Sequence, residues 1–192
     1  MRPSGNDRRH MYEVEVKVRA DHGDVRPELR ERDARPLGDL RQIDTYYDHP
    51  DRSFGETDEA LRLRREEDDG GDVTTLVTYK GPLVESASKT REEIETRVAD
   101  DEAFDAILRA LAFEPVADVR KERERFGLGG YTVTLDSVEG VGEFVEVEGE
   151  AREAEISAIR DGARELLRDL GLDPEEHVRT SYLEFVLGVD RD

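Results

Sequence analysis

The chain has 192 residues, of which 41% are charged, and a formal net charge of −20 at pH 7. So acidic a surface would repel the phosphate backbone of a nucleic acid, and the lack of cysteine excludes disulfides, thiolate metal sites and thiol nucleophiles. The sequence shows no long apolar run and no secretion signal, so we expect a cytoplasmic protein that neither spans nor binds a membrane.

Residues 1–10 carry Pro, Gly and Arg without a regular pattern, and we predict a disordered extension there. Residues 11–189 are predicted to form a single domain, since this length supports one hydrophobic core. Residues 12–19 alternate apolar with charged side chains, and valine at every second position favours a β-strand. The charged face of this strand carries Glu13, Glu15, Lys17 and Arg19.

Hydrophobic periodicity and turn residues predict the elements that follow. The first half is expected to contain a short polar helix over 25–34, a strand over 40–47, a turn-rich loop over 48–58, and strands over 60–65, 73–80 and 89–98. The second half is expected to contain a helix over 101–111, strands over 131–138 and 143–148, a long helix over 152–170, and a short helix or turn from Asp173. Residues 116–126 are ambiguous, because they are charged enough for a helix yet alternate as on a strand.

Capping and turn residues predict several of these boundaries. Asp100 or Asp101 is expected to cap the helix over 101–111, and Gly171 to end the long helix. Gly81 and the proline after it are expected to end the strand over 73–80. The apolar stripe of the 101–111 helix is predicted to consist of Phe104, Ile107, Leu108 and Leu111.

About seven or eight strands thus alternate an apolar face with a charged one. A sandwich would bury the apolar faces against each other and leave the charges in water, whereas a closed barrel covered by helices would hold the charges inside. The charges are sorted by sign, with acidic pairs on the first and last charged strands and basic pairs over 60–65 and 120–125. This sorting favours the barrel.

The charged faces carry two kinds of ligand. Hard oxygen ligands that suit Mg²⁺ or Mn²⁺ come from Glu13, Glu15, Asp136, Glu146 and Glu148. Cationic groups that suit phosphate oxygens come from Lys17, Arg62, Arg64, Lys80, Lys121 and Arg123. Together they predict a metal-bound polyphosphate, although each basic pair alone is also consistent with an ordinary surface ion pair.

Two features of the charge remain. Lysine is scarce, so the four that occur are candidates for positions that need a compact ammonium group, with chance survival as the alternative: Lys17, Lys80, Lys89 and Lys121. The net charge also costs stability through self-repulsion unless salt screens it. We therefore hypothesise adaptation to a salt-rich cytoplasm.

The stretch from Glu13 to Lys17 resembles the ExExK signature of the CYTH superfamily, the triphosphate tunnel metalloenzymes. The resemblance extends from Met11 to Leu187. It is carried by the ordered stretches 42–47, 62–64, 78–82, 89–93, 121–123, 135–136, 144–148 and 181–184. TYKGP, SKTREE and SYLE most resemble the class IV adenylyl cyclase-like branch in its archaeal form.

This resemblance implies an α+β fold in which an antiparallel barrel of eight strands, with helices packed outside, binds a triphosphate and Mg²⁺ or Mn²⁺ in its tunnel. It implies metal ligation by Glu13, Glu15, Asp136, Glu146 and Glu148. The catalytic group would comprise Glu13, Glu15 and Lys17. The triphosphate would contact Lys17, Arg62, Arg64, Lys80, Lys121 and Arg123, with Arg91 as a further contact.

Three activities fit this site. Adenylyl cyclase would convert ATP to cyclic AMP and pyrophosphate, a hydrolase would release orthophosphate from inorganic, thiamine or nucleoside triphosphate, and a sensor would bind without catalysis. Tyr46, Tyr79 and Tyr182 would either stack on a base or pack in the core. The four histidines, His10, His22, His49 and His177, are expected on the surface, and a homodimer is expected by analogy.

Overall fold

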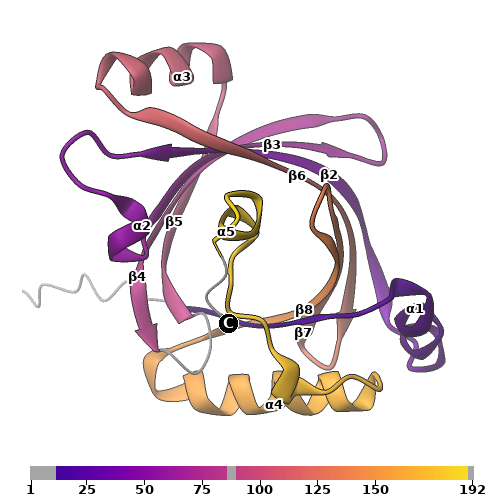
Figure 1. Ribbon diagram of the computed structural model, residues 1–192. Helices are drawn as coiled ribbons and strands as arrows, with labels where there is room; N and C mark the ends of the chain where they lie inside the picture. Colours follow the sequence, from indigo (N-terminus) through magenta and orange to yellow (C-terminus); the bar gives the residue numbers. More distant parts are fainter. Residues whose placement is uncertain (1–11, 86–89, 190–192) are drawn as a thin grey trace, which may run out of the picture.

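Eight strands close into an antiparallel barrel (Figure 1) in the computed structural model, which describes residues 12–85 and 90–189. Around the barrel the strands follow the order β1, β5, β4, β3, β2, β6, β7, β8. Their bounds are β1 Tyr12–Arg19, β2 Arg35–Asp48, β3 Ala60–Asp68, β4 Val73–Glu85, β5 Thr90–Val98, β6 Glu114–Leu128, β7 Tyr131–Val138 and β8 Gly142–Ala151. The predicted barrel is thereby confirmed and the sandwich excluded.

Five α-helices accompany the strands: α1 His22–Glu31, α2 Phe54–Thr57, α3 Asp101–Ala110, α4 Ile156–Asp169 and α5 Tyr182–Val186. Two short 3₁₀ turns, η1 Glu153–Glu155 and η2 Pro174–Glu176, flank α4. Among the described residues, none of these helices has the length and apolar character needed to cross a membrane. The predicted extension over 1–10, His10 and Lys89 lie outside the described residues.

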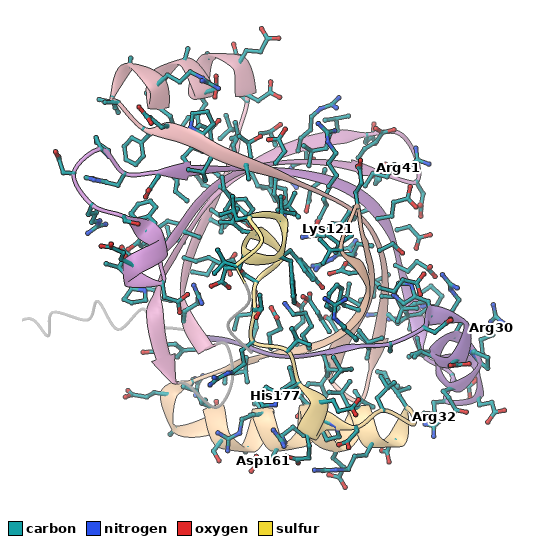
Figure 2. The ribbon with its side chains drawn as sticks, in the orientation of Figure 1. Arg30, Arg32, Arg41, Lys121, Asp161 and His177 are labelled. Atoms are coloured by element: carbon teal, nitrogen blue, oxygen red, sulfur yellow. The ribbon has the colours of Figure 1, made fainter. Side chains whose placement is uncertain are left out.

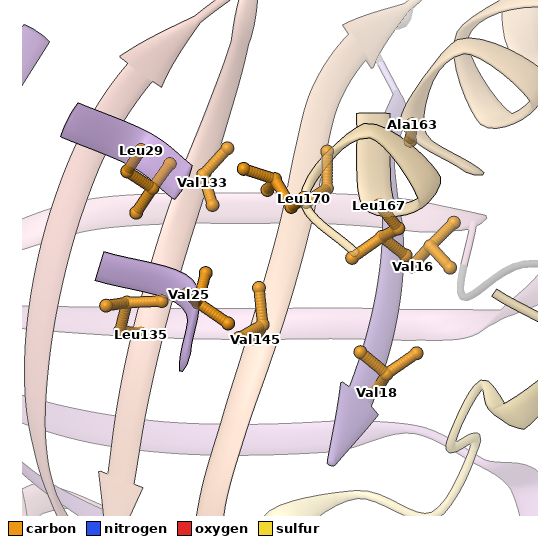
Figure 3. Packing of buried hydrophobic residues seen from close by; sticks show 11 residues of the cluster. Val16, Val18, Val25, Leu29, Val133, Leu135, Val145, Ala163, Leu167 and Leu170 are labelled. Atoms are coloured by element: carbon orange, nitrogen blue, oxygen red, sulfur yellow. The ribbon is translucent and has the colours of Figure 1, made fainter. Parts of the chain in front are cut away.

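The main core lies between the outer face of the barrel and two helices. Val16 and Val18 of β1 pack with valines of β7 and β8 beneath α1 and α4 (Figure 3). The helices contribute Val25, Leu29, Ala163, Leu167 and Leu170. The valines of β1 therefore point outward into this core, and the charged residues that alternate with them point into the barrel.

Helix α3 covers a second, smaller patch of the sheet. Leu108 is buried against Tyr47 and Leu63, and Asp100 caps the helix by accepting a hydrogen bond from the amide of Ala103. The predicted apolar stripe is wrong at Ile107 and Leu111, which are 53% and 61% exposed. Only the edge of α3 that carries Leu108 faces the sheet.

Several predicted boundaries are corrected by strand pairing. β4 continues through Gly81 and Pro82 to Glu85, because register shifts against β5 on either side of Leu83 interrupt the regular ladder. A proline, which lacks an N–H, is tolerated at such irregular positions. Residues 116–126, which were ambiguous, lie within β6.

The helical boundaries also move. α1 begins at His22 because the side chain of Asp21 accepts a hydrogen bond from the amide of Gly23. The long helix predicted from residue 152 starts as the 3₁₀ turn η1 and becomes α-helical only at Ile156. The loop predicted over 48–58 contains α2. Gly171 ends the long helix with a φ of 79°, as predicted.

The C-terminal helix α5 is the exception to helices packed outside. Figure 1 shows α5 within the ring of strands. At this level the inward-facing residues of β6, β7 and β8 change from charged to apolar, namely Val119, Val138 and Phe144. Tyr182 of α5 packs on this apolar seat, which explains why α5 lies inside.

Candidate functional site

The barrel encloses a cavity of about 480 Å³. Its walls are formed by the charged faces of the strands, so the interior is ionic (Figure 2). The predicted site residues that line it are Glu13, Glu15, Lys17, Arg62, Arg64, Lys80, Arg91, Lys121, Arg123, Glu146 and Glu148. Of the predicted set, Asp136 alone is not among the lining residues. The structure thus brings the two kinds of ligand into one enclosed space.

The basic wall is organised by one buried carboxylate, Asp44 of β2. Arg64 donates two hydrogen bonds to it, each 2.6 Å long. The Lys121 ammonium and the Arg62 guanidinium lie 3.4 Å and 3.6 Å from Asp44 Oδ2. Burial alone would raise the pKa of Asp44, but Lys121, Arg64 and Arg62 hold it well below its usual range.

This wall gathers three buried cations around one carboxylate. Arg62, Arg64 and Lys121 surround Asp44, and each is less than one-tenth exposed. Arg62 and Arg64 also lie 3.5 Å from Glu93 and 3.9 Å from Glu66, respectively. Burial and the neighbouring Arg64 lower the pKa of Lys121 to about 7. An anion bound beside Lys121 would stabilise its charged form.

The acidic wall lies on β1 and β8. The two strands pair so that Glu15 stands opposite Glu148, and Lys17 opposite Glu146. Burial and the neighbouring Glu13 raise the pKa of Glu148 to about 8, and burial and Glu15 raise the pKa of Glu146 to about 7. These carboxylates repel one another, and a cation between them would relieve the repulsion.

The donor set therefore fits a divalent cation such as Mg²⁺ or Mn²⁺. All the ligands are hard carboxylate oxygens, from Glu13, Glu15, Glu146 and Glu148. Across residues 12–85 and 90–189, no three acidic or imidazole groups converge into a finished metal site. The carboxylates would have to turn toward a bound cation.

Asp136 lies behind the wall and holds Arg123. Its two oxygens accept hydrogen bonds from Arg123 at 2.7 Å and 2.5 Å, and Oδ2 also accepts one from the Tyr182 hydroxyl at 2.9 Å. Burial opposes its charge, yet Arg123, with smaller effects from Lys121 and Tyr182, lowers the pKa of Asp136 to about 2. In this arrangement Asp136 positions a cation and does not face the cavity.

The remaining predicted cations are tied to other parts of the chain. Lys80 lies 2.7 Å from Glu93 and 3.6 Å from Glu13. Arg91 donates to the backbone carbonyl of Asp58, the residue that ends α2, at 2.9 Å. The loop around α2 thus contributes to the wall, although the sequence pattern predicted no role for it.

Two residues of the site, Asp44 and Glu93, were not predicted as site residues. They lie on strands that were predicted, but their role as partners of the cations depends on strand register. Tyr182 packs in an apolar cluster with Phe144 and also lines the cavity. His22, expected on the surface, is 1% exposed, and its Nε2 lies 3.0 Å from the carbonyl oxygen of Phe144.

Comparison with known proteins matches the same region of the chain. The family model described as the CYTH domain matches residues 11–182. A Methanocaldococcus jannaschii protein provisionally named an adenylate cyclase is 38% identical over 176 residues, which cover 91% of this chain and 98% of the relative. An Aeromonas hydrophila protein named adenylate cyclase CyaB is 28% identical over 167 residues, covering 83% and 78%.

A solved structure shares the fold as well. A Pyrococcus horikoshii protein superposes with a TM-score of 0.86 and 37% identity, covering 92% of this chain and 98% of that protein. The region matched by the family model contains all eight strands and ends at Tyr182.

Proposed function

Because the chain belongs to the CYTH domain family, we propose that its barrel cavity binds the triphosphate of ATP together with Mg²⁺ or Mn²⁺. The proposed reaction converts ATP to cyclic AMP and pyrophosphate. The names of the two sequence relatives support this choice of reaction.

Charge sorting across the cavity supports the proposal most directly. In the order of strands around the barrel, β1 and β8 are neighbours, and β3 and β2 lie diametrically opposite them. The acidic wall on β1 and β8 therefore faces the basic wall on β3, β2 and β6. A triphosphate on the basic wall with a divalent cation on its far side would neutralise both walls at once.

The side chains suggest how the reaction would proceed. The basic wall would bind the phosphate oxygens and stabilise the negative charge that grows on pyrophosphate as its bond to the α-phosphorus breaks. The new bond joins the ribose 3′ oxygen to the α-phosphorus, and the proton of the 3′ hydroxyl leaves to water. A divalent cation held by Glu13, Glu15, Glu146 and Glu148 would polarise phosphate oxygens and lower the pKa of the 3′ hydroxyl. Burial of these groups strengthens every electrostatic contact.

Hydrolysis of a triphosphate to release orthophosphate is the second candidate. The charged groups of the cavity would bind the phosphates of any triphosphate. Two of the tyrosines considered for stacking on a base make other contacts instead. Tyr182 packs in the core, and the Tyr79 hydroxyl contacts Glu59. Neither tyrosine supports recognition of a base.

Product identification tests the proposal. The protein is incubated with ATP and with tripolyphosphate in Mg²⁺ or Mn²⁺, and the products are separated. Cyclic AMP with pyrophosphate would support the cyclase, and orthophosphate would replace it with the hydrolase. Binding without either product would indicate a sensor, and no binding would overturn the proposal.

The variant Glu15→Gln tests the assignment of the acidic wall. We expect it to lose metal-dependent turnover by at least about 100-fold, because a neutral amide binds Mg²⁺ weakly. The matched control is Glu122→Gln, at a side chain on the outer face of β6 that is 74% exposed. Wild-type rates from Glu15→Gln would show that the metal lies elsewhere.

A further inference from the structure

The segment that follows α4 returns to the barrel beside Lys17. His177 pairs with Val18 in an isolated bridge, and the amide of Val178 donates to the carbonyl of Lys17 at 2.7 Å. The Lys17 ammonium in turn donates to the carbonyl of Thr180 at 3.0 Å. The C-terminal segment is thus fixed to β1 at a residue that lines the cavity.

A capping box then turns the chain into α5. The Ser181 hydroxyl accepts a hydrogen bond from the amide of Glu184, whose carboxylate accepts one from the amide of Ser181 at 2.7 Å. This cap directs Tyr182 into the barrel, where it is 7% exposed. Its ring lies 5.0 Å from the ring of Phe144, measured between centroids.

Tyr182 contacts three groups of the candidate site. Its hydroxyl donates to Asp136 at 2.9 Å. The ammonium of Lys17 lies 4.2 Å from the centroid of its ring, and that of Lys121 lies 5.4 Å away. Both distances fall within the range of a cation–π interaction. One side chain from the last helix therefore contacts two cavity cations and the partner of a third.

The third cation is Arg123, and its hydrogen bonds are divided between two directions. Nε and Nη2 donate to Asp136, and Nη2 also donates to Glu146 at 2.7 Å. Within the described part of the chain, Nη1 has no hydrogen-bond partner. A guanidinium has five donors in a fixed plane, so anchoring Nε and Nη2 determines where Nη1 points.

We propose that Tyr182 is a positioning residue for the triphosphate site, whose hydroxyl fixes Asp136 and thereby directs Arg123 Nη1 toward the bound phosphate. Its ring also holds the ammonium of Lys17 in place through the cation–π contact. The inference rests on the proposed function, because Arg123 and Lys17 matter only if the cavity binds a triphosphate. The C-terminal segment would then fix the side chains of Arg123 and Lys17, which belong to strands of the barrel.

The variant Tyr182→Phe tests the role of the hydroxyl, since it keeps the ring. Its matched control is Tyr131→Phe, which also removes a tyrosine hydroxyl hydrogen bond, here to the carbonyl of Ile159 at 3.1 Å outside the barrel. Affinity for tripolyphosphate with Mg²⁺ is measured by calorimetry. We expect Tyr182→Phe to bind roughly tenfold more weakly, as for the loss of one hydrogen bond to a charged group, and Tyr131→Phe to match the wild type.

A double-mutant cycle tests the route through Arg123. In an Arg123→Gln background the Tyr182→Phe change should weaken binding by less than about twofold, because the group it positions is gone. Additive losses would overturn this route. A structural role alone would lower the melting temperature in both backgrounds without this non-additivity.

The remaining outcomes separate this inference from the proposed function. Unchanged affinity of Tyr182→Phe in a wild-type protein that binds tripolyphosphate overturns only the role of Tyr182. Failure of the wild type to bind tripolyphosphate or ATP overturns the proposed function and this role with it. If Tyr182→Phe does not fold, Asp136→Asn weakens the same link from the other end, and wild-type affinity there overturns the inference.

Discussion

At the scale of single residues, Asp44 is the carboxylate around which the basic wall is arranged. It is fully buried and lies within 3.6 Å of Arg62, Arg64 and Lys121. Replacing it by asparagine would remove the carboxylate that the three buried cations share. We expect Asp44→Asn to lower the free energy of unfolding by about 3 kcal/mol, the typical cost of breaking a buried ion pair.

Urea unfolding measures this loss, and the exposed Asp118→Asn serves as the control. Added tripolyphosphate should restore much of the stability of Asp44→Asn, since it supplies negative charge to the same cations. An Asp44→Asn protein as stable as the wild type would contradict the organising role of this carboxylate.

Glu146 and Glu148 predict that the free energy of unfolding depends on pH. Burial with the neighbouring Glu15 raises the pKa of Glu146 from 4.5 to about 7, and burial with Glu13 raises that of Glu148 to about 8. Between about pH 5 and pH 7 the folded state therefore holds more protons than the unfolded chain, and above about pH 7 the lowered pKa of Lys121 opposes this effect. The free energy of unfolding should fall as the pH rises from about 5 to about 7.

Under the proposed function Mg²⁺ should reverse this loss, because a cation bound by the ionised carboxylates would displace their protons. Urea unfolding at about pH 5 and about pH 7, with and without Mg²⁺, measures both effects. Glu148→Gln should flatten the pH dependence, whereas Glu122→Gln should not. Stability that is constant over this range in Mg²⁺-free buffer would contradict the repulsion inferred for the acidic wall.

At the scale of elements, α4 stabilises the barrel from outside. Leu167 of α4 is fully buried, and Leu111, after α3, is 61% exposed. We expect Leu167→Ala to lower the free energy of unfolding by about 3 kcal/mol and Leu111→Ala by less than about 0.5 kcal/mol. Urea unfolding checks both values. Equal losses in the two variants would show that α3 is packed as closely as α4.

The barrel could be predicted at this scale because its signal is local. Alternation with a period of two assigns each residue of β1 to the inner or outer face without knowledge of its neighbours. The strand that carries Asp44 was predicted over residues 40–47 in the same way. The pairing of Asp44 with Arg64 was not predicted, because that contact depends on the register between β2 and β3.

Features that depend on several elements escaped prediction. The apolar seat of α5 consists of Val119, Val138 and Phe144, which belong to three different strands. No single segment of the sequence therefore predicts the position of α5. β4 runs through Pro82 because its irregular pairing with β5 makes the missing N–H harmless. In both cases the structure depends on tertiary contacts that local sequence propensity does not contain.

At the scale of the whole molecule, lysine and arginine occupy different places in the described residues. The three lysines in the described residues, Lys17, Lys80 and Lys121, all line the cavity. The described outer surface therefore carries its positive charge on arginine. This distribution supports the interpretation that lysine is kept where a compact ammonium is needed.

The net charge of −20 predicts that salt stabilises the folded protein. The melting temperature should rise steeply between about 0.1 M and 1 M KCl, where the Debye length falls from about 10 Å to about 3 Å. Thermal unfolding in a KCl series measures this rise. A flat response would remove the hypothesis of adaptation to a salt-rich cytoplasm, and the expected homodimer can be measured on the same samples.

The opposition of β1 and β8 to β3 and β2 has one more consequence. If the proposed function holds, two walls of opposite sign across one cavity would produce a transverse electric field. A triphosphate that enters the cavity would then turn its negative end toward Arg64. Ligands would thus arrive already oriented, and the orientational entropy lost on docking would be correspondingly smaller.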